Sequence, residues 1–539
     1  MSGQQPEIPK LGDIFSVSLN TRYQADPVEV LRCLADSSRE HILLESAEIN
    51  SRTNLKSLLL VDPALRIVCR GHQVDISACS ANGEILIPWL NETLSEQVPG
   101  IKTNTATDGH LRLTFPAAET QATEDERLKQ PGNLTPLRVL QQQLNNLTDQ
   151  PFAIFLAGVF AYDLLATFEQ LPDVAEGNND CPDYQFYLAE TLVVIDHQAQ
   201  STDIIGVVPG GDQFSLRHQQ VCQRIGELMA RLQQPQRAPQ PTKLPTQPVD
   251  FKNYFSQPDR PRYAEIVEDM KEHIRAGDIF QVVPAREFHL PCQGALASYA
   301  ALKESNPSPY MFYVKTLDFE LFGASPESAL KFSAATRQVE LYPIAGTRPR
   351  ARAADGTILA DQDSRIELAL RQDTKEMSEH MMLVDLARND LARIATVGSR
   401  YVADLLKVDR YSHVMHLVSR VVATLREDLD ALDAYRACMN MGTLVGAPKV
   451  SAATLIRQAE QSRRGSYGGA VGYLTGQGDM DTCIVIRSAF VKNQKAIVQA
   501  GAGVVFDSNT EAEVNETEQK ASAVIAAIVR ANQLQEAMS

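Results

Sequence analysis

The chain has 539 residues and a mass of 59.4 kDa, with 44% hydrophobic and 22% charged residues, the composition of a folded globular protein. Its 51 lysines and arginines against 67 aspartates and glutamates give a net charge of −16, which argues against nucleic acid as a main partner because phosphate binding favours a basic surface. The eight cysteines are scattered without a CxxC pair, so zinc and disulfide frameworks are not expected.

Targeting and membrane segments are not expected either. Residues 1–20 lack the basic segment followed by an apolar run that a signal peptide has. The longest apolar stretch, 152–162, is about half the ~20 residues that a membrane-spanning helix needs, and Asp163 closes it. We therefore expect a cytoplasmic protein that does not enter a membrane.

A proline- and glutamine-rich segment at 231–248 divides the chain. It has almost no apolar residues, which is typical of an extended connection that cannot bury itself. The segment predicts an N-terminal domain over 1–240 and a second domain over 250–539.

The predicted elements on both sides of this segment mix strands and helices. In the first part, a strand, a turn and a second strand are expected over 57–70, and a pair of strands over 190–208. In the second part, five apolar residues on one face predict a helix that stops at Gly277. Further strands are expected at 279–284, 310–314, 470–474, 483–491 and 496–506, and long helices at 366–394 and 513–533. Because there is no regular βαβ rhythm, we expect an α+β fold with large, mostly antiparallel β-sheets.

The C-terminal helix has an acidic start on its buried side. Glu513, Glu516, Lys520, Val524 and Ile528 are spaced by three or four residues and share one stripe. The lower half of the stripe is apolar and must face a core. The carboxylates are therefore either a solvated first turn favoured by the helix dipole or part of a partly buried site, and the spacing alone leaves both interpretations open.

The predicted helix in the middle of the chain repeats this pattern. Asp373, Glu376, Glu379, Leu383 and Leu386 share a stripe that is acidic at its N-terminal end and apolar below. If the two helices face each other, four carboxylates meet, and their mutual repulsion calls for protonation or a cation. Oxygen ligands without cysteine or histidine suit Mg²⁺.

Two glycine-containing segments are candidates for anion binding. Gly501, Ala502 and Gly503 end an apolar strand, where glycine indicates either a packing bulge or a close approach of the backbone, whose N–H groups could hold a carboxylate. The segment 442–449 (GTLVGAPK) lacks the GxxxxGK[ST] pattern, and no GxGxxG sequence follows a predicted strand. A P-loop or Rossmann enzyme is therefore not expected.

The motifs of the chain occur in the order of a known family. They are LLES at 43–46, NPSPYMFY at 306–313, SPE at 325–327, PIAGTR at 343–348, MLVDLARNDLAR at 382–393, HVMHLVSR at 413–420, GTLVGAPK at 442–449, GSYGGAVGY at 465–473, IVIRS at 484–488 and the segment 499–520. With them the chain resembles the chorismate-utilising enzymes, and within these the large-subunit (component I) family of bacterial anthranilate synthases. The resemblance implies two intertwined domains, with antiparallel sheets packed face to face and helices outside.

The resemblance implies a substrate and a metal. The substrate is chorismate, which has two carboxylates, a C4 hydroxyl and an enolpyruvyl ether. By motif, Glu376 and Glu513 would hold Mg²⁺, with Glu379 and Glu516 acting through water, and the ion would in turn hold the ring carboxylate.

The remaining substrate contacts also follow from the resemblance. The enolpyruvyl carboxylate would be bound by the Arg487 guanidinium, a bidentate donor, by Tyr467, and by the backbone at Gly501, Ala502 and Gly503. The ring pocket would be lined by Gly346 and Thr347, approached by Thr443, and given positive charge by Lys520.

The implied reaction has two steps. Ammonia adds at C2 while the C4 hydroxyl leaves, and Glu327 would be the general acid. The aminodeoxyisochorismate formed then loses its C2 proton and pyruvate, and His416 would support this elimination as a base or by orienting the intermediate, since neutral imidazole accepts a proton near pH 7. His413 is the competing histidine, with a structural role as its default.

Two positions distinguish the subfamilies. Aminodeoxychorismate synthases typically carry a lysine nucleophile where this chain has Ala345, and the isochorismate and salicylate synthases carry a water-activating lysine where it has Gln281. Neither alanine nor glutamine can perform these roles. Both departures favour free ammonia as the nucleophile and anthranilate as the product, with the other synthases as the alternative functions.

Partners and regulation are implied as well. No amidotransferase motif is visible, so ammonia would come from a separate glutamine amidotransferase subunit (component II), in a heterotetramer, or from solution. A second site for the end product tryptophan would be formed by Glu45, Ser46, Lys56, Pro309, Tyr310 and Met311.

Two other functional classes are alternatives to a chorismate-converting enzyme. A ligand-binding regulator could keep the fold without chemistry, but the intact set of Glu327, His416, Arg487 and Glu513 argues against it. A metal-dependent hydrolase could use four carboxylates, but it would not explain the PIAGT, GAG and LLES motifs together.

Overall fold

The computed structural model describes residues 9–36, 39–47, 54–107, 109–116, 123–234, 249–353, 356–411 and 414–538. These residues form strands β1 (Asp13–Thr21), β2 (His41–Ala47), β3 (Asn54–Arg70), β4 (Gln73–Ala78), β5 (Lys102–Thr107), β6 (His110–Thr114), β7 (Asn145–Asn146), β8 (Phe155–Phe160), β9 (Tyr184–Asp196), β10 (Ser201–Pro209), β11 (Phe255–Gln257), β12 (Gln281–Val282), β13 (Ala285–Pro291), β14 (Tyr310–Lys315), β15 (Glu320–Ser325), β16 (Ser328–Ser333), β17 (Gln338–Leu341), β18 (Ile344–Pro349), β19 (Tyr401–Arg410), β20 (Val414–Thr424), β21 (Gly446–Ala447), β22 (Ala470–Thr475), β23 (Met480–Ile484), β24 (Ser488–Lys492) and β25 (Lys495–Gly501). The helices are α1 (Pro27–Leu34), α2 (Ala81–Gln97), α3 (Glu124–Lys129), α4 (Thr135–Gln142), α5 (Phe214–Gln233), α6 (Arg260–Ala276), α7 (Ala295–Ser305), α8 (Ala360–Gln372), α9 (Thr374–Ala392), α10 (Ala431–Cys438), α11 (Gly442–Val445), α12 (Lys449–Glu460) and α13 (Thr510–Met538).

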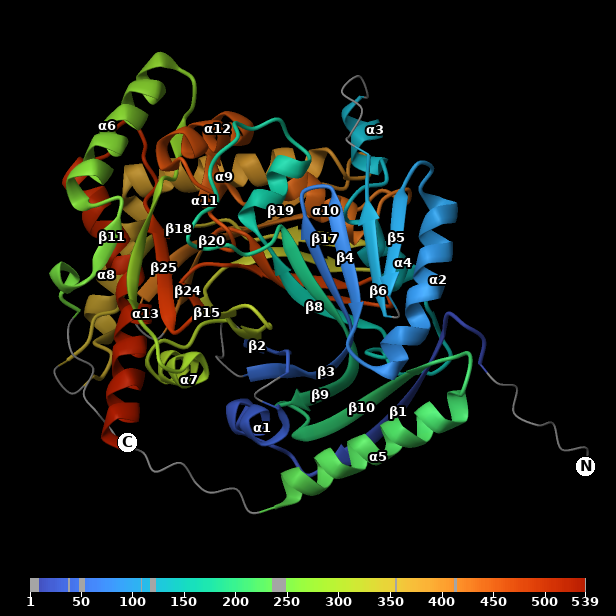
Figure 1. Cartoon of the computed structure of the whole chain (residues 1–539). Coiled ribbons are helices and arrows are strands. Elements are labelled where there is room, and N and C mark those ends of the chain that lie inside the picture. The colour runs from blue at the N-terminus through green and yellow to red at the C-terminus, as the bar shows by residue number, and fades with distance from the viewer. Residues whose placement is uncertain are drawn as a thin grey trace, which may run out of the picture.

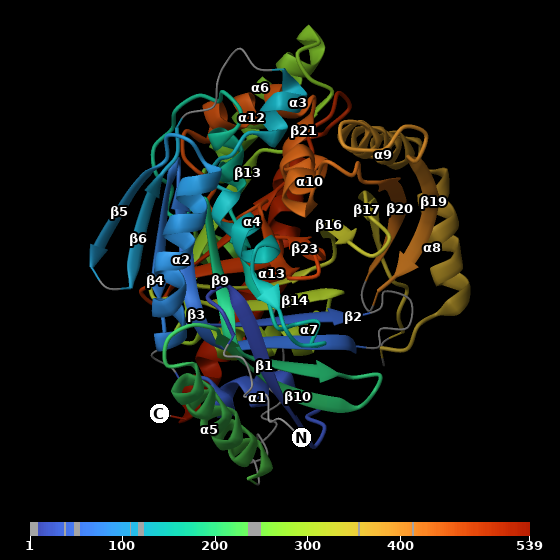
Figure 2. The same cartoon turned by 90° about the vertical axis from the view of Figure 1, so that its right-hand side faces the viewer.

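The fold is α+β and its ladders are mostly antiparallel, as the sequence predicts. Among the described strands, only the short β1–β7 pairing is parallel. Helices flank the strands on several sides (Figure 1), and α8, α9, β19 and β20 are grouped at one side of the molecule, opposite β4, β5 and β6 (Figure 2). No helix formed by the described residues has the length and apolar character to cross a membrane.

The first part of the chain is built on β3 and β9. The pair of strands expected over 190–208 is confirmed as β9 and β10. The turn expected within 57–70 is wrong, because β3 runs continuously along β9 and absorbs register shifts at Asp62 and Pro63. Proline has no N–H for the ladder, and here it produces a bulge rather than a turn.

Two ladders join the parts of the chain on either side of the predicted linker. β2 pairs with β14, and β8 pairs with β22, in both cases antiparallel. Most of the linker, 235–248, lies outside the described residues, and the two-domain division at 240–250 stays a prediction. The strand pairs nevertheless place segments of both parts side by side.

Of four further predicted elements in the second part of the chain, the helix is confirmed and the three strands are shorter than expected. The helix ending at Gly277 is confirmed as α6, and Gly277 caps it at φ +86°. The strand expected over 279–284 is only β12, which pairs with β21. The strand expected over 483–491 is divided into β23 and β24 around Arg487, whose φ of +49° breaks the extended conformation. The strand expected over 496–506 ends at Gly501.

The single long helix expected over 366–394 is wrong. Two helices, α8 and α9, meet at Asp373, which has an extended backbone and accepts hydrogen bonds from the amides of Lys375 and Glu376. A short carboxylate competes well for free amides at a helix start, so Asp373 caps α9 and is not part of the acidic stripe. Glu376 and Glu379 consequently stand in the first turns of α9.

The apolar half of the α13 stripe is buried, as predicted. Ala521, Val524 and Ile528 belong to one hydrophobic core with Phe322 of β15 and Val498 of β25. In Figure 1, α13 runs past β25 and beside α7. Burial of this apolar face fixes α13 against the sheet and thereby orients its acidic first turns.

Candidate active site

His416 and Thr347 lie opposite each other in the ladder of β20 and β18. Thr347 Oγ1 is 2.8 Å from His416 Nδ1, and the imidazole packs edge-on against Tyr411, with ring centroids 5.1 Å apart. Burial, with a smaller contribution from the Arg487 cation, lowers the pKa of His416 to about 3. The imidazole is therefore neutral near pH 7. His413 lies outside the described residues.

Glu327 is a buried carboxyl just beyond β15. Its Oε1 accepts a hydrogen bond of 3.1 Å from Thr443 Oγ1, and its backbone amide donates to Ser325 Oγ. Burial raises the pKa of Glu327 to about 8, although Thr443 and the Lys520 cation act in the opposite direction. At neutral pH the side chain therefore holds a proton that it can donate, which suits the predicted general acid.

The acidic starts of α9 and α13 face each other, as the paired stripes predict. Lys375 of α9 lies 3.8 Å from the carboxylate of Glu513 on α13. Burial, followed by the charges of Glu376 and Glu516, raises the pKa of Glu379 to about 7. Burial also raises the pKa of Glu513. Carboxylates that raise each other's pKa create a demand for positive charge.

That demand is met by basic side chains. Arg348 lies 2.8 Å from Glu376, and Lys520 lies 2.6 Å from Glu516. Within the described ranges, no three histidine, cysteine or carboxylate side chains are arranged so as to hold a metal ion. The all-oxygen donors on facing helices fit Mg²⁺ in chemistry.

Residues Gly501 to Gly503, called the glycine segment below, lie against side chains of the site. Lys520 Nζ donates to the carbonyl of Gly501 at 2.9 Å. A Cβ on Gly501 would stand 3.2 Å from the hydroxyl of buried Tyr467, and one on Gly503 would stand 2.8 Å from Gln281 Nε2. The backbone at both glycines therefore lies too close to its neighbours for a side chain, and binding of a carboxylate by its N–H groups stays a prediction.

The cation expected to bind the enolpyruvyl carboxylate is available. Arg487 lies between β23 and β24, and in the described part of the chain its guanidinium has no ion-pair partner. Its charge lowers the pKa of His416, and the charge of Glu516 acts on it in turn. The Arg487 guanidinium therefore interacts electrostatically with His416 and with Glu516 at the acidic start of α13.

Comparison with known proteins agrees with this geometry. The family model described as chorismate binding enzyme matches residues 101–526. The chain belongs to this family. It is 55% identical over 512 residues to anthranilate synthase component 1 of Vibrio cholerae, covering 95% of each chain, and 54% identical over 522 residues to that of Salmonella typhimurium, covering 96% and 98%. The resemblance seen in the motifs is confirmed.

Solved structures of the chorismate-binding family share the architecture. Anthranilate synthase component I from Streptococcus pneumoniae has a TM-score of 0.64 at 26% identity, covering 93% of this chain and 97% of that one. The menaquinone-specific isochorismate synthase from Escherichia coli also has a TM-score of 0.64, at 17% identity, covering 97% and 96%. The second similarity concerns the fold alone.

The two positions expected to distinguish the subfamilies lie beside residues of the candidate site. Ala345 is on β18, opposite Leu417 and one residue before Gly346, which has φ +73°. Gln281 Nε2 donates to Glu379 Oε1 at 2.7 Å, while its buried Oε1 has no hydrogen-bond partner among the described residues. The site therefore offers an unused amide oxygen beside the acidic helix starts.

The residues expected to bind tryptophan come together on three adjacent strands. Ser46 of β2 lies opposite Tyr310 of β14 and Lys56 of β3. These three side chains therefore share one face of the sheet. The amide of Ala47 donates to the carbonyl of Pro309, which holds the start of β14 against β2.

Glu45 and Met311 form the next pair of the same ladder, so they share the opposite face. Glu45 accepts hydrogen bonds from Tyr299 and, at 2.6 Å, from Lys303, both on α7. The predicted set thus divides over two faces, with Glu45 already paired to the helix that packs on α13.

Some residues of the site gave no signal in the sequence. Arg348 and Lys375 balance the carboxylates, but an arginine or lysine beside a motif is ordinary surface composition. Tyr263 of α6 was expected only as an apolar face residue, yet its hydroxyl accepts a hydrogen bond from the amide of Ala502 at 3.3 Å and donates one to the carbonyl of Pro284. Only the tertiary structure connects them to the site.

Proposed function

We propose that this chain is the chorismate-converting component of an anthranilate synthase, a lyase that makes anthranilate and pyruvate from chorismate and ammonia in the first committed step of tryptophan biosynthesis. The observation that carries the proposal is Glu327, a buried carboxyl with a pKa raised to about 8 and a hydrogen bond from Thr443. A protonated carboxyl is what departure of the C4 hydroxyl requires. Relatives named anthranilate synthase component 1, similar over almost the whole chain, support it.

Mg²⁺ is part of the proposal. Glu376 and Glu513 would hold the ion, with Glu379 and Glu516 acting through water, because these carboxylates are the oxygen donors on the facing helices. When bound, Mg²⁺ would supply positive charge to the ring carboxylate of an anionic substrate in an otherwise acidic region. Arg348 and Lys375 form ion pairs with Glu376 and Glu513 and balance part of this negative charge.

Ammonia is the proposed nucleophile. Ala345 and Gln281 offer no amine for covalent attack and no base for activating water, which argues against the aminodeoxychorismate and isochorismate alternatives. The unpaired Oε1 of Gln281 can accept an N–H of ammonia, and Glu379, fixed by Gln281 Nε2, can take up a proton because its pKa is raised to about 7. Both groups would hold ammonia near C2.

His416 is proposed to orient the intermediate in the elimination. A pKa of about 3 makes the imidazole a poor base in the free site. The Thr347 hydroxyl occupies Nδ1 and leaves Nε2 for the substrate. An anionic substrate beside the ring would raise the pKa and could permit proton transfer.

The remaining substrate carboxylate would bind to Arg487, Tyr467 and the backbone at Gly501 to Gly503. The Ala502 amide, which donates to Tyr263, would orient this backbone rather than bind the carboxylate. The open Arg487 guanidinium is a planar bidentate donor. Lys520 would hold the glycine segment through the Gly501 carbonyl. The shape of this subsite therefore depends on α13, β25 and the segment before β22.

Partners, location and regulation complete the proposal. Ammonia would come from a glutamine amidotransferase subunit, component II, in a heterotetramer. The eight cysteines are all unpaired, which supports a cytoplasmic location. Tryptophan would inhibit by binding at the β2, β3 and β14 residues, because strand β2 contacts both parts of the chain.

The function is tested by following the fluorescence of anthranilate. The purified chain is given chorismate and Mg²⁺ with either ammonium or glutamine. Anthranilate is expected from ammonium and not from glutamine, because no amidotransferase is present. Absence of anthranilate with ammonium, in a folded preparation that binds chorismate, would overturn the proposed function.

A further inference from the structure

The side chain of Arg464 lies behind the candidate site and does not belong to the predicted set. It is only 2% exposed. Its guanidinium forms two hydrogen bonds with Glu460, of 2.9 and 2.6 Å. It also donates to two backbone carbonyls, at 2.8 Å to Leu444 and at 2.6 Å to Val283. A buried arginine with this many partners joins chain segments that are far apart in the sequence.

Both carbonyls belong to segments that carry residues of the site. Leu444 directly follows Thr443, whose hydroxyl donates to Glu327. Val283 follows Val282, which exchanges backbone hydrogen bonds with Val504 just after the glycine segment. The orientation of the Glu327 carboxyl and the position of the glycine segment therefore both depend on where the guanidinium holds these carbonyls.

Glu460 extends the same link to the glycine segment. Its Oε1 accepts a hydrogen bond of 2.8 Å from the amide of Ala285, and Ala285 lies opposite Gly501 in the ladder of β13 and β25. The carboxylate that orients Arg464 is thus bonded to the strand against which Gly501 is placed.

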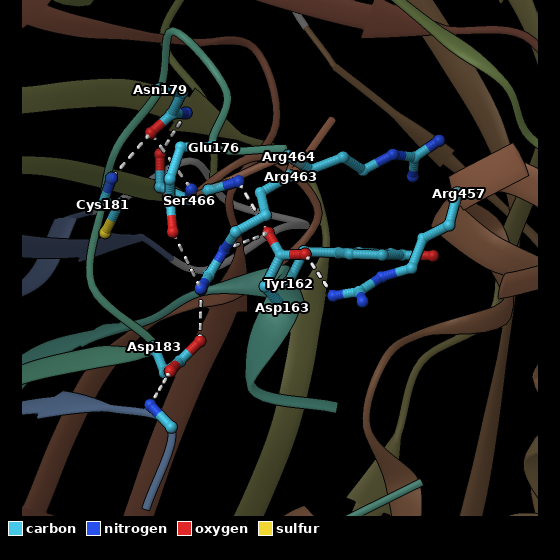
Figure 3. A network of polar contacts seen from close by, with 12 residues as sticks. Tyr162, Asp163, Glu176, Asn179, Cys181, Asp183, Arg457, Arg463, Arg464 and Ser466 are labelled. Atoms are coloured by element: carbon cyan, nitrogen blue, oxygen red, sulfur yellow. Dashed lines mark hydrogen bonds and ion pairs between the residues drawn. The ribbon is translucent and has the colours of Figure 1, made fainter. Parts of the chain in front are cut away.

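Tyr467 rests on the same guanidinium. The Arg464 guanidinium carbon is 4.6 Å from the ring centroid of Tyr162 and 5.7 Å from that of Tyr467. The chain between Arg464 and Tyr467 is fixed separately, since the Gly465 amide donates to Asp163 and Asn179 donates to Ser466 Oγ. In Figure 3, Arg457 points to Asp163 and Arg463 lies between Asp163 and Asp183, whereas the Arg464 side chain points away from Asp163.

We infer that Arg464 is a positioning residue for the chorismate site, which holds the Thr443, glycine and Tyr467 segments in one arrangement without contacting substrate. This inference rests on the proposed function. A lysine has one ammonium and cannot reach Glu460 and two carbonyls in the planar geometry of a guanidinium. Displacing the site segments by about 1 Å is enough to reduce turnover roughly a hundredfold.

The test compares Arg464→Lys and Arg464→Gln with Arg217→Gln as a matched control. Arg217 on α5 is likewise buried, at 4% exposure, and donates to Asn82 Oδ1 at 2.8 Å and to the carbonyl of Pro209 at 2.7 Å. Thermal unfolding shows which variants fold. The dissociation constant of chorismate is measured calorimetrically with Mg²⁺ and no ammonium, and KM and kcat with ammonium.

Both Arg464 variants are expected to bind chorismate about tenfold more weakly and to lose roughly ten- to hundredfold in kcat/KM. The Arg217 variant is expected to unfold at a lower temperature with an unchanged chorismate affinity, because among the described residues Arg217 bonds no segment of the candidate site. A merely structural role of Arg464 would reduce the folded fraction and hence the apparent kcat, but not the affinity of the molecules that remain folded. If Arg464→Gln does not fold, the Lys variant decides.

Chorismate affinity unchanged in the folded Arg464→Lys variant, or weakened equally by Arg217→Gln, would overturn the inference. Failure of the proposed function is a different result, because the wild type would then form no anthranilate from ammonium. Chorismate affinities still report on Arg464 in that case if the wild type binds chorismate.

Discussion

Thr347 Oγ1 and His416 Nδ1 are 2.8 Å apart across the β18–β20 ladder, so the hydroxyl fixes which imidazole nitrogen faces the substrate region. A buried histidine with a pKa of about 3 is rarely charged. His416 therefore acts through hydrogen bonds in the free site, whereas protonated Glu327 can act as an acid. The second reaction step should depend on this histidine more than the first.

Replacement of His416 by alanine is expected to slow the elimination about 10²- to 10⁴-fold, with smaller loss in amination. Aminodeoxyisochorismate should then accumulate during a single turnover and be separable from anthranilate by chromatography. Thr347→Val keeps the ring but removes its hydroxyl partner, and a milder form of the same defect is expected. Equal loss of both steps in His416→Ala would instead assign the histidine to substrate binding.

The pKa of Glu327 predicts a pH dependence. Because the acid form is required, kcat/KM should fall as the pH rises through about 8, and Glu327→Gln should lose both this decline and at least 10²-fold in activity. The sign for stability follows from proton binding. Above about pH 4.5 the unfolded chain releases the Glu327 proton, whereas the folded protein keeps it up to about pH 8. The free energy of unfolding of the wild type therefore falls as the pH rises through this range. The Gln variant should gain stability relative to wild type between pH 5 and about 8.

Two measurements check this, a pH profile of kcat/KM and denaturant unfolding at several pH values. A basic limb that persists in the Gln variant would assign the titration to another group. A stability difference between the Gln variant and wild type that does not change with pH would show that Glu327 has an ordinary pKa in the folded state.

Removal of divalent cations should abolish anthranilate formation from ammonium and, once an amidotransferase subunit is added, from glutamine, because the acidic helix starts repel an anionic substrate unless a cation lies between them. Glu513→Gln is expected to weaken the apparent affinity for Mg²⁺ by about tenfold or more. Glu511→Gln is the control, since Glu511 lies in the same first turn but pairs with Arg260 away from the cluster. Full activity in excess EDTA, or equal effects of the two variants, would contradict the metal assignment.

The choice of nucleophile should depend on Gln281 and Ala345. Gln281→Lys replaces the free amide oxygen with an ammonium beside Glu379, so ammonia-dependent activity should fall roughly ten- to hundredfold, and water could become a substrate. Ala345→Lys should also impair ammonia addition. Gln519→Lys on the exposed side of α13 adds the same charge and should have little effect. Wild-type anthranilate formation in both site variants would show that these positions do not select the nucleophile.

Much of this arrangement could be predicted from the sequence, and the failures have physical causes. The stripe on α13 was recognisable because periodicity reports burial directly. The same periodicity continues across Asp373, where a capping carboxylate ends one helix and starts another. The sequence pattern around Pro63 predicts a turn, because the pattern alone does not show that β9 lies alongside and supports a bulge. Arg464 was invisible for a similar reason, since its partners lie up to 181 residues away.

Ser46 lies on the sheet face where tryptophan is proposed to bind. Ser46 shares one sheet face with Lys56 and Tyr310, whereas Glu45 points to the other face and binds Tyr299 and Lys303 of α7. Because α7 packs on α13, a ligand that shifts β2 can affect the helix carrying Glu513 and Glu516. Phenylalanine at position 46 should cover the face that Ser46 shares with Lys56 and Tyr310 and remove a hydroxyl without disturbing Glu45.

For Ser46→Phe we therefore expect tryptophan inhibition to weaken at least tenfold while uninhibited turnover persists. Ser18→Phe, which places the same ring on the exposed strand β1, is the control for nonspecific effects. Tryptophan is titrated against all three proteins at fixed chorismate, and its binding is measured separately by calorimetry. Equal sensitivity of wild type and Ser46→Phe would mean that the β2 segment is structural, because a residue in contact with the bound indole could not exchange its hydroxyl for a six-membered ring without cost.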